Sequence, residues 1–234
     1  MFVYDRTPKT RATYNPAMSD TPSTEAHAPL SRQDRKDQTR KSLMQAALQL
    51  MGEGRSFTSL GIREIAREAG MVPNAFYRHF RNTDELGLSL VDGVGVTLRR
   101  LLRQARQPGS AETSVVRASV RVYHDYVRKN RLLFLFICSE RAGGSRILRL
   151  AIREEVRHFV NDMARDMALM PSYRELAEGS LQMVCSLIVN TMLAAAPEIL
   201  DQPIDDPAQE DASLQTFVQQ MQLILLGAAA WRAH

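Results

Sequence analysis

One short segment of the chain, residues 72–79, carries side chains of the kinds that bind nucleic acids; it reads VPNAFYRH. The amide of Asn74 can form two hydrogen bonds with a single base, best with the N6 and N7 edge of adenine. The methyl groups of Val72 and Ala75 can touch the methyl group of a thymine. Three further side chains carry donors suited to phosphate oxygens, which position a protein on a duplex without specifying sequence: Tyr77, Arg78 and His79.

Two short helices joined by a glycine turn are expected to hold this segment. Apolar residues recur at i, i+3, i+4 and i+7 over residues 62–69, which predicts an amphipathic helix. Gly70 follows where a helix ends and the backbone needs a positive φ. Pro73 suits the first position of the next helix, whose buried stripe is Phe76 and Phe80. This is the helix-turn-helix pattern, and the second helix of such a unit usually lies in the DNA major groove.

The distribution of charge favours a polyanionic partner for the first part of the chain. The formal net charge is only +4 over 234 residues. Residues 32–106, however, hold 14 Lys and Arg against 8 Asp and Glu, whereas residues 107–234 hold 13 against 15. A basic N-terminal third is typical of a domain that faces nucleic acid, and an ordinary solvated surface is the alternative.

The run from Ile62 to Phe80, with AREAG followed by FYRHF, resembles the DNA-binding domain of TetR-type transcriptional regulators. A longer stretch, RSFTSLGIREIAREAG and then FYRHFRNTDELGLSLVD, is similar to the FabR and DesT regulators of unsaturated fatty-acid synthesis. The closer match covers about residues 36–107 well and the remainder loosely. The resemblance implies an all-α, TetR-like fold with an N-terminal three-helix helix-turn-helix domain and a C-terminal helical domain for ligand binding and dimerisation. It also implies that Tyr77 and His79 contact phosphates.

Two positions depart from the family pattern. Gly61 stands where a Ser or Thr often caps the second helix, but glycine caps nearly as well. Thr83 stands where a lysine often contacts phosphate, so one positive charge is lost while a hydroxyl remains. Arg63, at the start of the second helix, can reach the DNA backbone or a groove edge. The predicted DNA-binding residues are therefore Arg63, Val72, Pro73, Asn74, Ala75, Tyr77, Arg78, His79 and Thr83.

The chain is expected to divide into three parts, with no convincing strand and no internal repeat. Residues 1–31, rich in Pro, Ser and Thr, are predicted to be a disordered extension. Residues 32–81 form the helix-turn-helix domain and residues 82–234 the helical effector-binding and dimerisation domain. An acidic linker with three prolines is expected over residues 197–207. Besides the two short helices, seven more are predicted: 34–51, 82–106 (opened by a capping box at Asn82 and Glu85), 112–129, 131–141, 145–170, 172–196 and 209–232.

Two long stretches without charge, residues 179–197 and 213–231, suggest a dimer interface. Both contain amide and hydroxyl side chains, which makes them too polar for lipid-facing spans, so no membrane association is expected. Paired with their symmetry mates they can form a four-helix bundle, although one face of each can instead cover the monomer core. The predicted interface residues are Leu181, Val184, Ile188, Met192, Phe217, Met221 and Ile224.

A flexible, aromatic lining inside the C-terminal domain favours a lipophilic effector, which the resemblance implies to be long-chain acyl-CoA. Methionine-rich surroundings adapt to irregular ligands, although for any single residue a filled core is the plainer alternative. Arginines flanking the break at Gly143 and Gly144 can meet the phosphates of a CoA head group or simply be solvated. The predicted ligand-binding residues are Tyr123, Tyr126, Phe134, Arg141, Arg146, Arg149, Phe159, Met163 and Met183.

Enzymatic function is not expected. The five histidines are scattered, and no HExxH, GxSxG or P-loop motif occurs, so no catalytic residue, metal site or cofactor is predicted. Cys138 and Cys185 are expected to be reduced core thiols of a cytoplasmic protein. The resemblance implies a dimeric repressor of unsaturated fatty-acid or desaturase genes that binds a palindromic DNA operator and responds to long-chain acyl-CoA. The alternatives are a TetR-type repressor of an efflux or catabolic operon with another lipophilic effector, and an architectural DNA-binding protein without one.

Overall fold

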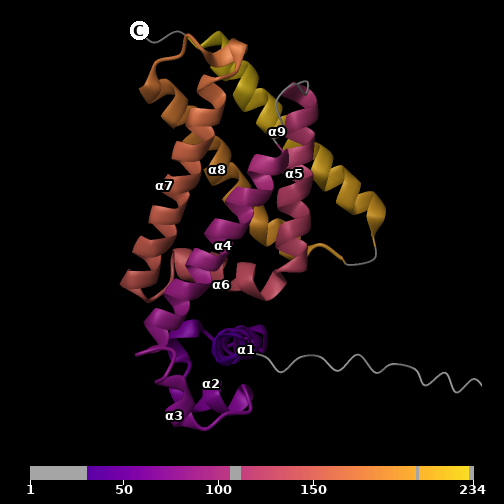
Figure 1. The fold of residues 1–234 in the computed structure, drawn as a ribbon. Coiled ribbons are helices and arrows are strands. Elements are labelled where there is room, and N and C mark those ends of the chain that lie inside the picture. Colours follow the sequence, from indigo (N-terminus) through magenta and orange to yellow (C-terminus); the bar gives the residue numbers. More distant parts are fainter. Residues whose placement is uncertain (1–30, 106–111, 204–205, 232–234) are drawn as a thin grey trace, which may run out of the picture.

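The protein is a stack of helices with a small unit at one end, as the computed structural model in Figure 1 shows. The structure describes residues 31–105, 112–203 and 206–231, so the predicted extension over residues 1–31 lies outside the described residues except for Ser31. Every regular element in these ranges is helical, which confirms the all-α prediction. The elements are α1 (Arg32–Gly52), the 3-10 helix η1 (Phe57–Ser59), α2 (Ile62–Glu68), α3 (Pro73–Phe76), α4 (Thr83–Ala105), α5 (Glu112–Lys129), α6 (Arg131–Arg141), α7 (Arg146–Ala168), the 3-10 helix η2 (Pro171–Tyr173), α8 (Glu178–Asp201) and α9 (Pro207–Ala230).

Helix α4 connects the small N-terminal unit with the bundle behind it (Figure 1). Its start is capped as the NTDE sequence predicts, because the side-chain oxygen of Asn82 accepts from the backbone N–H of Glu85 at 2.9 Å. The carboxylate of Glu85 accepts at 2.7 Å from the N–H of Arg81, one residue earlier than a capping box requires. The cap fixes where the recognition unit ends and the long helix begins.

The two parts share a continuous apolar core. Phe57, between α1 and α2, meets the ring of Phe136 on α6 edge to face, with centroids 4.9 Å apart. Gly87 on α4 allows this approach, because a Cβ there would lie 2.8 Å from a methyl of Leu148 and 3.0 Å from the ring of Phe57. Since both rings are fully buried, the DNA-binding unit is packed onto the bundle rather than tethered to it.

Helix α8 differs from the sequence prediction at both ends. It begins at Glu178 rather than near residue 172, because Pro171 opens the separate turn η2. It continues through Pro197 to Asp201, so the predicted linker over residues 197–207 is much shorter. Burial of Ile199 and Leu200 stabilises the last turn enough to offset the hydrogen bond that a proline cannot make. The side chain of Arg131 also donates to the carbonyl oxygen of Leu200.

Helix α8 is also the one described helix that is long and apolar enough to cross a membrane, with a mean hydropathy of 1.7. It packs against α5, α6, α7 and α9, in the middle of the bundle. Core helices of soluble proteins meet the same criteria of length and composition, and this packing accounts for the apolar character of α8.

Candidate nucleic-acid interface and effector cavity

The turn between α2 and α3 is built from local backbone signals. Gly70 has a φ of 69°, and its N–H donates to the carbonyl oxygen of Arg67 at 2.9 Å. The next N–H, from Met71, donates to Ala66 at 2.8 Å. These two bonds complete a Schellman motif, which ends α2 and turns the chain sharply. Pro73 then occupies the first turn of α3, as predicted.

The start of α2 is stabilised by a backbone hydrogen bond and an ion pair that were not predicted from the sequence. The N–H of Gly61 donates to the carboxylate of Glu64 at 3.0 Å, and Arg55 donates to both oxygens of that carboxylate at 2.8 and 3.1 Å. The hydrogen bond from Arg55, followed by that from Gly61, lowers the pKa of Glu64. The glycine cap at this position is therefore supported by a charged pair rather than by a hydroxyl.

Most of the predicted DNA-binding side chains on α2, α3 and the turn between them are exposed. Val72 and Tyr77 are 69% and 59% exposed, an unusual degree of exposure for large apolar groups. Phe76 and Phe80 face inward with their rings 5.6 Å apart, so they anchor the recognition helix from behind. Four other members of the set are exposed, namely Arg63, Pro73, Asn74 and Arg78, while Ala75, His79 and Thr83 are half-buried.

His79 lies in a strongly basic environment. Burial is the main cause that lowers its pKa, and the charges of Lys36, Arg40 and Arg78 add to it. A neutral imidazole still carries one N–H, so it can donate to a phosphate oxygen without contributing a charge. Its Nδ1 is buried with no hydrogen-bond partner among the described residues, which leaves Nε2 as the nitrogen able to serve such a contact.

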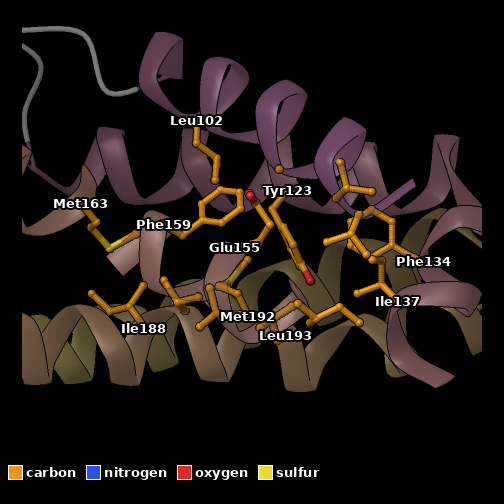
Figure 2. Close-up of a pocket in the computed structure, with 16 residues that line it drawn as sticks. Leu102, Tyr123, Phe134, Ile137, Glu155, Phe159, Met163, Ile188, Met192 and Leu193 are labelled. Atoms are coloured by element: carbon orange, nitrogen blue, oxygen red, sulfur yellow. The ribbon is translucent and has the colours of Figure 1, made fainter. Parts of the chain in front are cut away.

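A cavity of about 90 Å³ lies in the bundle between α4, α5, α6, α7 and α8 (Figure 2). Four of the predicted ligand-binding residues line it: Tyr123, Phe134, Phe159 and Met163. Figure 2 shows the Tyr123 side chain reaching between the helices toward Leu193. Its hydroxyl is buried without a hydrogen-bond partner among the described residues, and burial raises its pKa. It is therefore a neutral donor in a largely apolar cavity, available to a polar atom of a ligand.

The other predicted ligand-binding residues do not line this cavity. The ring of Tyr126 packs edge to face against the ring of Phe134, which itself lines the cavity. Met183 is 44% exposed on α8, because the apolar residues of that helix face more than one side. The arginines lie at the junction of α6 and α7, where Arg141 donates to Asn190 at 2.9 Å, Arg149 donates to the carbonyl oxygen of Gly143, and Arg146 is exposed.

The sequence analysis missed several lining residues, of which Glu155 and Gly95 are the most informative. Glu155 on α7 is ion-paired with Arg99 on α4 across the wall of the cavity. Gly95 makes this contact possible, since a Cβ at that position would overlap the carboxylate. On the outer side, Arg99 lines a groove together with Arg100 and Arg103. The remaining lining residues are apolar and come from α4, α6, α7 and α8: Val91, Val94, Leu102, Ile137, Ile152, Val156, Ile188, Val189, Met192 and Leu193.

The predicted dimer-interface residues face the interior of the monomer instead. Leu181, Val184, Phe217 and Met221 are buried in the core, and Ile224 is half-buried against it. Ile188 and Met192 line the cavity. Within the monomer these side chains cover the core, since an apolar period marks a buried face without saying whether its partner is the same chain or another. The large apolar side chains left exposed on α8 and α9 are Met183, Leu187, Leu223 and Leu226.

These features define a class of protein: a helix-turn-helix DNA-binding regulator with a helical effector domain. Residues 43–90 match the model of the bacterial regulatory proteins of the tetR family, and residues 113–224 match that of the tetracyclin repressor-like C-terminal domain. The chain therefore belongs to the TetR family. It is a DNA-binding transcriptional regulator and not an enzyme.

Solved structures of similar fold include two regulators called FadR, of which the first is described as a fatty acid degradation regulator. The FadR of Bacillus halodurans superposes with a TM-score of 0.63 at 16% identity over 83% of this chain and 97% of its own. The Bacillus subtilis FadR in complex with stearoyl-CoA gives 0.61 at 14% identity over 80% and 98%. AibR in complex with isovaleryl coenzyme A and operator DNA gives 0.58 at 14% identity over 78% and 97%. At these identities the likeness establishes the fold alone.

Proposed function

We propose that this regulator is a homodimeric, cytoplasmic repressor of fatty-acid genes of the unsaturated-fatty-acid or desaturase type. It binds a palindromic operator, and long-chain acyl-CoA is its effector. The observation that carries the proposal is the apolar cavity that contacts α4, the helix leading directly from the recognition unit. The acyl-CoA complexes of regulators with the same fold support this choice of effector.

The volume of the cavity suggests how a ligand can move α4. An apolar cavity of about 150 Å³ accommodates a benzene ring, so one of about 90 Å³ holds only a few methylene groups. A longer acyl chain must separate α4 from α7 and α8, which also line the cavity. Because α4 is continuous with the recognition unit, this separation changes the distance between the two recognition helices of a dimer.

The groove outside the cavity suits the polyanionic end of the same ligand. Arg99, Arg100 and Arg103 line it together with one carboxylate, that of Asp162, which pairs with Arg103 at 3.2 Å. The cations outnumber the carboxylate, and guanidinium groups bind phosphates through paired hydrogen bonds. The ion pair between Arg99 and Glu155 separates groove from cavity, so a ligand that spans both must open it. We propose this groove, rather than the exposed arginines at the junction of α6 and α7, for the CoA phosphates.

The exposed apolar side chains of α8 and α9 support a dimer. Leu223 and Leu226 are 73% and 68% exposed on α9, and Leu187 is 52% exposed on the neighbouring α8. Two such helices from each subunit form a four-helix bundle, which buries these groups and sets two recognition helices one helical turn apart.

The small volume of the cavity favours a second candidate function. A lipophilic effector without a long chain fits it without helix movement, as expected for a repressor of an efflux or catabolic operon. Such a regulator would respond to compounds that lack a polyanionic head.

The test is fluorescence anisotropy with a palindromic duplex from a desaturase or fatty-acid synthesis promoter at fixed salt. Protein is titrated alone and with a saturated acyl-CoA, an unsaturated acyl-CoA or free CoA. We expect the two acyl-CoAs to shift affinity in opposite directions and free CoA to have little effect. An R100A/R103A double variant should weaken the acyl-CoA response while keeping DNA affinity without ligand. Tight DNA binding that neither acyl-CoA changes would refute the effector while leaving the DNA-binding assignment intact.

A further inference from the structure

A buried histidine on α5 lies beside two carboxylates. This group is separate from the predicted DNA-binding residues and from the residues that line the effector cavity. His124 has no exposed surface, and its Nδ1 lies 3.7 Å from a carboxylate oxygen of Asp125 and 3.8 Å from one of Glu210 on α9. Both separations are too long for a hydrogen bond, and Nδ1 has no other hydrogen-bond partner among the described residues. The two carboxylates remain partly exposed, so the group is reachable from solvent.

The opposite ring nitrogen is oriented by a polar chain from the end of α8. The side-chain nitrogen of Gln202 donates to the hydroxyl of Ser213 at 2.6 Å, which turns the amide oxygen of Gln202 toward His124. That oxygen lies 3.2 Å from Nε2, so Nε2 carries the proton in the neutral ring. Nδ1 is then a buried lone pair that faces two carboxylate acceptors.

Three acceptors that face one another are stabilised by a cation between them. The ligand atoms of His124, Asp125 and Glu210 all lie within 4.8 Å of one another. Two ligands of one zinc ion, each bound at about 2.0–2.2 Å, can lie up to about 4 Å apart, which matches the spacing to Nδ1. An outer hydrogen bond that fixes the tautomer of the histidine, as Gln202 provides here, is characteristic of metal-binding imidazoles.

We propose that His124, Asp125 and Glu210 form a binding site for a divalent transition metal of the Zn²⁺ type. One imidazole nitrogen with two carboxylate oxygens suits Zn²⁺, whereas Mg²⁺ and Ca²⁺ prefer oxygen ligands alone. Water completes the coordination from the exposed side. Arg128 holds the second oxygen of Glu210 at 3.1 Å and leaves the first free to bind the ion.

The ion would join three elements that meet at this corner of the bundle. His124 and Asp125 come from α5, Glu210 from the first turn of α9, and Gln202 follows the last residue of α8. Since α9 carries the proposed dimer surface, metal binding would fix the position of that surface relative to α5. Zn²⁺ that binds only the folded chain also raises the thermal stability by mass action.

The test uses full-length protein without an affinity tag, stripped of metal by EDTA and titrated with ZnCl₂ against a chromophoric chelator. We expect one Zn²⁺ per chain and a rise in the melting temperature on loading. Asp125→Asn and Glu210→Gln should each weaken the affinity by about tenfold or more while circular dichroism shows both variants folded. His124→Asn should abolish binding.

The matched control is His158→Asn on α7. His158 also lies beside two carboxylates, those of Glu154 and Glu155 at 3.4 and 3.3 Å, but it is exposed and its ring nitrogens already have these partners. Its replacement should leave the zinc affinity unchanged. Loss of binding in this control, unchanged affinity in Asp125→Asn and Glu210→Gln, or absence of stoichiometric binding would each overturn the proposal. A thiolate charge-transfer band in the Co²⁺-loaded protein would also overturn it, because the ion would then be held by a cysteine.

Discussion

The guanidinium group of Arg40 on α1 donates a hydrogen bond of 2.9 Å to the backbone carbonyl oxygen of His79, just beyond the recognition helix. The same group donates to the hydroxyl of Ser89 on α4 at 2.5 Å and lies 4.3 Å from the centre of the Phe80 ring. One side chain therefore ties the recognition unit to the helix that contacts the cavity.

Removing this link should lower both stability and operator affinity. We expect Arg40→Ala to cost about 1–3 kcal/mol of unfolding free energy, because two acceptors lose a charged donor. Arg40→Lys should recover only part of this, since an ammonium group cannot reproduce the planar fork of donors. Urea unfolding and DNA anisotropy measure the two effects. Lys41→Ala, at an exposed position on the same helix, is the control, and equal stability of the Arg40 and Lys41 variants would contradict the role of Arg40.

Asn74 and Arg78 should differ in what they contribute to DNA binding. Asn74→Ala should reduce discrimination at one base pair by about 1–3 kcal/mol and leave the salt dependence unchanged. Arg78→Ala should weaken binding to all sequences alike and lower the slope of log affinity against log salt by about one. Anisotropy with single-base operator variants at several salt concentrations separates the two. A uniform loss for Asn74→Ala would show that Asn74 does not contact a base.

A single added methyl group should affect the stability of the protein differently at two glycines of α4. A Cβ at Gly93 meets nothing within 4 Å, so Gly93→Ala should stabilise the protein by up to about 1 kcal/mol through helix propensity. A Cβ at Gly95 would displace the end of the Glu155 side chain and its ion pair with Arg99, so Gly95→Ala should be less stable than Gly93→Ala by about 1–2 kcal/mol and should alter the effector response. The melting temperatures of the two variants are measured by thermal unfolding, and each variant serves as the control for the other. Equal melting temperatures would mean that α4 and α7 are less closely packed than the structure shows.

The free energy of unfolding should fall as the pH rises and Glu140 ionises, which is the reverse of the usual effect of a carboxylate. Its carboxylate is buried on α6, and one of its oxygens has no hydrogen-bond partner in the described part of the chain. Burial is the main cause that raises its pKa above the ordinary 4.5. The folded state then binds its proton more tightly, so ionisation opposes folding as the pH rises above the ordinary value. Glu140→Gln should unfold at a higher urea concentration than the parent protein at about pH 7, and the difference should vanish at about pH 4.

Glu64 provides the opposite case within the same chain. The bond from Arg55 lowers its pKa, so its ionised form favours folding and the contribution is lost as the pH falls. Glu64→Gln should therefore lower the urea midpoint at about pH 7, the reverse of Glu140→Gln. A decrease in both variants would show that Glu140 is held by partners that stabilise its charge.

Charges on the exposed face of α9 should separate the proposed dimer. Leu223→Glu combined with Leu226→Glu places two carboxylates in the bundle expected between subunits, where like charges would be desolvated. We expect a folded monomer by sedimentation velocity and a large loss of operator affinity. Leu169→Glu, at a residue that is 79% exposed at the end of α7, is the matched control and should remain a dimer. A dimeric double variant would place the interface elsewhere.

Local signals in the sequence were sufficient for the recognition unit. The backbone φ angles that Gly70 and Pro73 favour end one helix and begin the next. Phe76 and Phe80 then identify the side of the recognition unit that is buried. The same kind of signal predicted the bounds of α5 and α6. A local signal predicted the wrong end for α8 at Pro197, where burial of the following residues outweighs the local preference of proline against helix.

What the sequence by itself determined is the class of fold and the position of the helix-turn-helix, because both depend on residues a few positions apart. Only the tertiary structure decided which sides of α8 and α9 are inside: Ile188 and Met192 turn to the cavity, while Leu187 and Leu223 stay exposed. Both helices are apolar on more than one side, so the period of their sequence cannot choose between core and partner. The contacts of Arg40 with His79 and of His124 with Glu210 join residues 39 and 86 positions apart, and no local pattern encodes such contacts.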